Sequence, residues 1–152
     1  MEPCNALRAS PALSHRPFIS FSLADLLFVV FSQLDLRENQ IGRWGVKPLA
    51  EALCVNTSVM QVNLDGYSLP IKQLKGTETV ASIDLSHKCL GVASVVVIAS
   101  LIQGNGSLRR LDVGANNLSA ESKDLLHQAV GLSKWAVQQG YTMGRSGIEL
   151  KL

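Results

Sequence analysis

The sequence predicts an α/β repeat protein with short parallel strands on one face and helices on the other. Four strand cores follow one apolar template and begin at residues 34, 62, 83 and 111, so their spacings are 28, 21 and 28 residues. Such a period is typical of a solenoid, whose units bury their apolar faces only by stacking. Most strand cores are followed by apolar residues at helical spacing, and the turns Asn56–Ser58 and Asn105–Ser107 lead back to the next strand.

The composition fits one modest globular domain. The chain has 152 residues, of which 47% are apolar and 17% are charged, and its net charge is +2. No clustered basic stripe accompanies this charge, so neither nucleic acid nor a membrane is expected as a partner. The cysteines Cys4, Cys54 and Cys89 form no C-x-x-C pair, so we expect no disulfide framework and no zinc site. A reducing compartment, the cytoplasm, is predicted.

Two segments precede the repeats. Residues 1–17 contain three prolines among Ser, Ala and Arg, which predicts a disordered tail. Residues 18–31 are strongly apolar, and Ser22 followed by Asp25 resembles a capping box, so an N-terminal capping helix is predicted. The alternative is a targeting segment that directs the chain to an organelle or to secretion. Asp25 inside the apolar run and the missing cleavage pattern argue against it, and the run is too short to span a bilayer.

The first unit shows both periodicities. Leu34 and Leu36 alternate with polar residues and should point inward from a strand. A helix is then expected from its apolar spacing over Val46 to Leu53. Pro48 is expected in the first turn of this helix, where its missing amide costs no hydrogen bond.

This unit, Phe31-x-x-Leu34-x-Leu36-x-x-Asn39-x-Ile41-Gly42 and the helical segment after it, resembles the ribonuclease-inhibitor type of leucine-rich repeat. The resemblance covers about residues 31–131 and implies a short solenoid of about four repeats over residues 32–131, with a parallel sheet on the concave face and helices on the convex face. It also implies that Asn39 and Asn116 are structural turn residues that bond backbone groups. Tyr67 and Lys88 occupy the equivalent positions in the middle units, so the asparagine series is interrupted there.

The middle units depart from the template. In the second unit, Pro70 and Gly76 leave room for only a very short helix, which should flatten the arc locally. In the third, the run from Val92 to Gln103 is so rich in valine that propensity alone favours a strand. The repeat register assigns it to a helix instead.

The last unit leads to the C-terminus. Ser119 is expected to cap a helix, and Glu121 suits the positive helix end. The template lapses after Gly131, so residues 132–147 are interpreted as an irregular insertion. Residues 148–152 alternate between apolar and charged, and are predicted to form a terminal capping strand.

Enzyme chemistry is not expected. The histidines His15, His87 and His127 share no metal-binding or acid–base spacing. The glycine-rich segments at residues 104–107 and 144–147 lack the spacing of a phosphate-binding loop. We therefore predict no catalytic residue, no metal and no cofactor.

The outward side chains of the strands are the candidate binding residues. In register they form three columns: Gln33, Gln61, Ser82 and Arg110; Asp35, Asn63, Asp84 and Asp112; and Arg37, Asp65, Ser86 and Gly114. Stacked acids destabilise a sheet unless cations or a ligand compensate them. The middle column is therefore interpreted either as a recognition stripe for a basic partner or as strand-end acids that add solubility. The predicted partner-binding residues are Gln33, Asp35, Arg37, Gln61, Asn63, Asp65, Asp84, Arg110 and Asp112.

Similar repeats occur in ribonuclease inhibitor, in the activating protein of the Ran GTPase and in the sensor region of nucleotide-binding oligomerisation-domain receptors. The resemblance implies a scaffold that binds another protein through the concave strand face. Two alternatives are a regulator of a GTPase and a degenerate repeat fragment without a partner of its own. The sequence determines neither the identity of the partner nor the oligomeric state.

Overall fold

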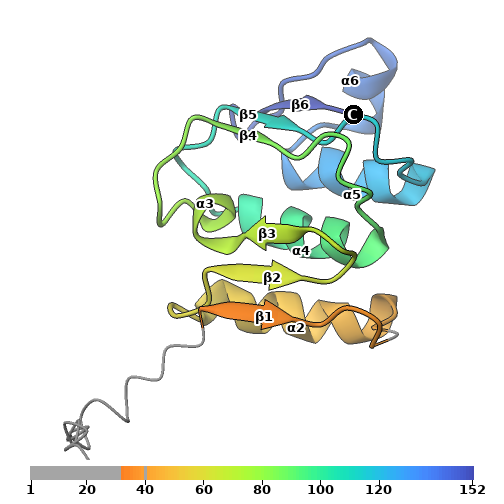
Figure 1. Ribbon diagram of the computed structural model, residues 1–152. Helices are drawn as coiled ribbons and strands as arrows, with labels where there is room; N and C mark the ends of the chain where they lie inside the picture. Colours follow the sequence, from red (N-terminus) through yellow and green to blue (C-terminus); the bar gives the residue numbers. More distant parts are fainter. Residues whose placement is uncertain (1–31, 40) are drawn as a thin grey trace, which may run out of the picture.

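The computed structural model describes residues 32–39 and 41–152, and its elements form a mixed α/β fold (Figure 1). The predicted tail (residues 1–17) and capping helix (residues 18–31) lie outside the described residues. The strands are β1 (Gln33–Asp35), β2 (Gln61–Asn63), β3 (Ser68–Pro70), β4 (Ser82–Asp84), β5 (Arg110–Asp112) and β6 (Glu149–Lys151). The helices are α2 (Arg43–Val55), α3 (Ile71–Lys75), α4 (Val92–Ile102), α5 (Ala120–Ala129) and α6 (Lys134–Gln138).

The strands form two three-stranded sheets, which corrects the expectation of one parallel sheet through all four strand cores. One sheet has the order β1-β2-β3 and the other β4-β5-β6. Strands β1 and β2 are parallel, and so are all three strands of the second sheet. The interruption comes from β3, which is antiparallel to β2 and occupies the edge where β4 was expected to pair.

The short second unit causes this interruption. Gly66 has a φ of 100°, a conformation that favours glycine, and the chain reverses there between β2 and β3. Leu69 then lies opposite Val62, and both side chains are fully buried. The short helix α3 follows and ends at Gly76, whose φ is 78°. The predicted short helix between Pro70 and Gly76 is therefore confirmed, whereas β3 was not foreseen.

Helices α2, α4 and α5 form a layer behind the strands, with α4 in the middle (Figure 1). Because α3 is so short, α4 packs directly against α2. The helical assignment of the valine-rich run is confirmed, since α4 spans Val92–Ile102 and seven of its 11 residues are buried. Burial on several sides explains why the run carries so few polar residues.

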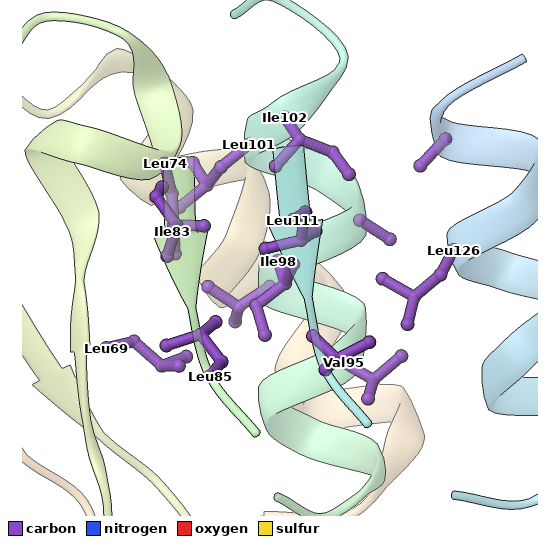
Figure 2. Packing of buried hydrophobic residues seen from close by; sticks show 14 of the residues in the cluster. Leu69, Leu74, Ile83, Leu85, Val95, Ile98, Leu101, Ile102, Leu111 and Leu126 are labelled. Atoms are coloured by element: carbon purple, nitrogen blue, oxygen red, sulfur yellow. The ribbon is translucent and has the colours of Figure 1, made fainter. Parts of the chain in front are cut away.

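One apolar core joins the two sheets. Figure 2 shows Leu69, Leu74, Ile83 and Leu85 packing towards α4, with side chains of α4 between them and Leu126 of α5. Val95 and Ile98 of α4 are fully buried in this cluster. The helical layer therefore joins the two sheets into one core, although no strand pairing connects them.

The helix starts differ in how well the sequence predicted them. Ser119 caps α5 as predicted, since its side-chain oxygen accepts a hydrogen bond of 3.2 Å from the Ser122 amide. The expectation for Pro48 was wrong. Helix α2 begins at Arg43, so Pro48 lies in the second turn, where proline removes the amide that would donate to the Trp44 carbonyl.

The C-terminal region folds back on the second sheet. Residues 132–147 contain α6 and then return to the strands, where the Leu150 amide donates to the Thr142 carbonyl over 2.8 Å. Strand β6 pairs with β5 within the stretch predicted as a terminal strand. Gly144 approaches the carbonyl of Val130 so closely that no side chain fits there. In the described part of the chain, no helix has the length and apolar character needed to cross a bilayer.

Candidate functional site

The candidate site is the strand face, which we define as the outward side chains of the two sheets and of the turns that follow the strands. Gln33 lies beside Gln61, and Asp35 beside Asn63. In the second sheet, Ser82, Arg110 and Glu149 form one row, and Asp84, Asp112 and Lys151 form the next. The first two of the three predicted columns thus exist within each sheet, but β3 interrupts them between the sheets. The third column lies beyond the paired strand residues. The described part of the chain contains no group of acids, histidines and cysteines suited to hold a metal.

The four residues of the middle column, three aspartates and Asn63, have a role in the turns. The side-chain Oδ1 of each accepts a hydrogen bond from a backbone amide just beyond the strand. The bonds are Arg37 to Asp35 (3.1 Å), Gly66 to Asn63 (2.8 Å), Ser86 to Asp84 (2.9 Å) and Gly114 to Asp112 (3.0 Å). Aspartate or asparagine at these positions therefore has a structural reason that is independent of any partner.

Two of the carboxylates are also paired with cations. The Arg37 guanidinium binds Asp35 through Nε and through Nη2 (2.7 Å), and these hydrogen bonds are the main cause that lowers the pKa of Asp35. Lys151 Nζ lies 2.7 Å from Asp112 Oδ2, and this bond lowers the pKa of Asp112. Lys151 was not among the predicted site residues. The alternation of residues 148–152 was the signal for it, because it turns Lys151 to the same side as Asp112.

The third carboxylate, Asp84, has no ion pair in the described structure. The Ser86 hydroxyl donates to Asp84 Oδ1 over 2.7 Å, and this bond is the main cause that lowers its pKa. Arg110, on the neighbouring strand, is exposed and also has no ion pair among the described residues. Asp84 and Arg110 are therefore two exposed charges on adjacent strands that no ion pair of the described residues occupies.

Asp65 has a different position from the one predicted. It is half-buried, and its Oδ2 accepts hydrogen bonds of 3.0 Å from the amides of Gly91 and Ser94. These amides lie at the start of α4, where a carboxylate complements the positive helix end. A Cβ atom on Gly91 would lie 2.8 Å from the carboxylate. Asp65 thus caps the central helix, and we leave it out of the proposed interaction surface.

The two predicted turn asparagines are not equivalent. Asn116 is buried, and its Nδ2 donates to the carbonyls of Val113 and Leu85 over 2.7 and 2.8 Å. Its Oδ1 accepts from the amides of Lys88 and Leu90 in the preceding unit. Asn39 is exposed and donates only one bond, to the Arg37 carbonyl, among the bonds described. Asn116 therefore joins two units, whereas Asn39 serves its own turn.

The two positions without asparagine meet each other. Lys88 Nζ lies 5.2 Å from the centre of the Tyr67 ring, within the range of a cation–π contact. The contact connects the two sheets, and it is made by the two side chains that interrupt the asparagine series. The sequence indicated the interruption but not the contact.

The candidate site is interpreted from its geometry alone, because no related protein was found for the chain. Comparisons of the chain with protein-family models, with curated proteins and with solved structures found no match.

Proposed function

We propose that the chain is a divergent leucine-rich-repeat solenoid of about four units that works as a protein-interaction scaffold. A shared turn geometry supports the repeat assignment. Four residues after the start of each strand core, the backbone has a positive φ: 61° at Glu38, 100° at Gly66, 55° at His87 and 56° at Ala115. This conformation is uncommon outside glycine, so its recurrence at one template position supports a common origin of the four units.

The partner is proposed to bind the strand face. The observation that carries this proposal is that Asp84 and Arg110, on adjacent strands, are exposed and have no ion pair among the described residues. Hydrogen bonds from Ser86 already fix the Asp84 carboxylate, so binding loses less side-chain entropy. Beside Arg110, Ser82 is exposed and offers a polar contact, and the exposed Gln33 and Gln61 offer further ones on the first sheet. The partner is therefore another protein whose surface presents both an acid and a base.

The proposed partner differs from the strongly basic surface that the acidic column indicated. Arg37 and Lys151 already neutralise two of the carboxylates. A basic partner would have to displace these cations, whereas a surface of mixed charge does not. We propose a cytoplasmic location, which the free thiols of Cys54 and Cys89 support.

Charge reversal on the strand face tests the function. The double variant Asp84→Lys, Arg110→Asp keeps the net charge but inverts both signs. Proteins captured from a lysate by the wild-type chain should be lost with this variant. The reversed charges would repel the base and the acid of the partner that Asp84 and Arg110 attract in the wild type. They should be retained with Lys123→Glu, an exposed position on α5 behind the sheets. Retention of the same proteins by the double variant, with unchanged circular dichroism, would contradict the proposal.

A further inference from the structure

The helical layer carries a second candidate surface, a groove of about 1000 Å³ on the side away from the strands. We call it the helix groove. It is lined by residues of α2, α4 and α5 and by the chain after α5. Its apolar side chains are Trp44, Val96, Ala99, Leu125, Ala129 and Val130. None of these residues belongs to the strand face.

The position of α4 explains the shape of the groove. Helix α4 packs between α2 and α5, and packed helices lie about 8–10 Å apart, so α2 and α5 stand roughly 16–20 Å apart. Ala99 and Ser100 of α4 form the floor of the groove, and their short side chains make it deeper there. Trp44 rises from α2 with 89% of its surface exposed. An α-helix laid on this floor would pack on α4 at an ordinary interaxial distance of about 8–10 Å, with Trp44 of α2 beside it.

The charges of the groove have one sign. Lys47 of α2 and Arg145 of the C-terminal region are its charged lining residues, and both side chains are exposed. Glu51 and Glu121 belong to α2 and α5 but do not line the groove. The occupant therefore needs an apolar side for the floor and carboxylates for the two cations.

We propose that the helix groove binds an amphipathic helix of a partner protein that has leucine-like residues on one side and glutamate or aspartate beside them. Such a helix places residues at spacings of three and four on one face and lays that face in an apolar groove. The binding is independent of the strand face, so the chain joins two different partners across its two sides.

Two synthetic peptides test this proposal on the full-length chain. Both have about 18 residues with leucine at helical spacing of three and four, and their polar positions are all glutamate in one and all lysine in the other. Binding is measured by isothermal titration calorimetry and by the tryptophan fluorescence of the chain. The glutamate peptide should bind at least about tenfold more tightly than the lysine peptide, because it pairs with both cations instead of repelling them.

A charge reversal in the groove makes the test specific. The double variant Lys47→Glu, Arg145→Glu should invert the preference and bind the lysine peptide more tightly. The matched control Lys123→Glu, Arg109→Glu changes the net charge equally at exposed residues outside the groove, and should keep the original preference. The strand-face variant Asp84→Lys, Arg110→Asp should also leave peptide binding unchanged, which separates this proposal from the previous one.

Three results would overturn the proposal. The first is equal affinity for the two peptides, and the second is an unchanged preference after the reversal in the groove. The third is failure of the full-length chain to bind either peptide. If neither peptide binds, sedimentation velocity distinguishes two other occupants. A second copy of the chain in the groove would give a dimer, whereas occupation by residues 1–31 of the same chain would leave a monomer.

Discussion

Asn116 joins neighbouring units through a single side chain. It bonds the carbonyls of Val113 and Leu85 and the amides of Lys88 and Leu90, and three of these four bonds cross more than 25 positions of the sequence. Leaving a buried polar group unsatisfied costs about 1–3 kcal/mol. The side chain therefore contributes more to stability than its small size indicates.

Replacing Asn116 by alanine should lower the free energy of unfolding by about 2–4 kcal/mol, because several buried backbone groups lose their partners. Asn39→Ala, the matched change at the exposed equivalent position, should cost less than about 1 kcal/mol. Urea denaturation followed by circular dichroism measures both. Equal losses for the two variants would show that Asn116 has no special role.

The left-handed turns make a second prediction at single residues. Ala115 has a φ of 56° and an exposed side chain, so glycine should relieve the strain of the Cβ atom. We expect Ala115→Gly to raise the free energy of unfolding by about 0.5–1 kcal/mol. Ala81→Gly is the control, since Ala81 is exposed and its φ is not positive. That change should lower stability slightly, and a gain there as large as at Ala115 would contradict the explanation.

At the scale of elements, Asp65 links the second unit to the central helix. Asp65→Ala should lower the free energy of unfolding by about 1–2 kcal/mol, because the amides of Gly91 and Ser94 lose their acceptor. Asp65→Asn keeps an acceptor oxygen without the charge and should cost less. Hydrogen exchange at the start of α4 should accelerate in the alanine variant. Unchanged exchange there would show that the cap is not needed.

The pairing of β6 with β5 is sensitive to pH through Lys151 and Asp112. The pKa of Asp112 is lowered from 3.8 by Lys151 first and by the Gly114 amide second. A carboxyl with a depressed pKa stabilises the fold above its unfolded pKa, and this contribution is lost as the pH falls through the folded pKa. The Lys151→Ala variant should therefore be less stable than the wild type by about 0.5–1 kcal/mol at pH 7.

This stability difference should disappear in acid, as the pH falls below the ordinary Asp value of 3.8 and through the depressed pKa of Asp112. Thermal unfolding at a series of pH values measures it. Lys123→Ala, at an exposed position on α5, is the control and should follow the wild-type profile. A Lys151→Ala difference that persisted unchanged in acid would exclude the ion pair as its cause.

The sequence predicted those elements whose signals are local or repeated. The register identified α4 although its valines favour a strand, and Pro70 and Gly76 marked the ends of α3. Strand β3 escaped prediction because Ser68–Pro70 has one apolar residue and a proline, a composition that seldom indicates a strand. The role of Asp65 also escaped, since its partners lie 26 and 29 positions away and only the fold brings them together.

The candidate site was predictable to a similar extent. The outward columns of β1 with β2, and of β4 with β5, follow from alternation and register alone. The pairing of Asp112 with Lys151 does not, because it requires the C-terminal strand to join the second sheet in one register. Spacing alone could not indicate the helix groove either, because its lining residues come from three helices and the chain after α5.

At the scale of the whole molecule, the shared core should make both sheets unfold together. Ile98 is fully buried in the helix that lies between α2 and α5, so Ile98→Ala should lower the free energy of unfolding by about 2–5 kcal/mol. Amide exchange in β2 and in β5 should accelerate by the same factor in this variant. Acceleration confined to one sheet would show that the halves are independent folding units.

The antiparallel strand β3 also determines how the side chains of the strand face are arranged. It divides the strand face into two blocks, each with its own register, because no strand pairing passes from β3 to β4. A straight, extended partner that follows one block cannot continue in step onto the other. Under the proposed function, a single partner segment would therefore contact either one block alone or both blocks through two parts that are offset from each other.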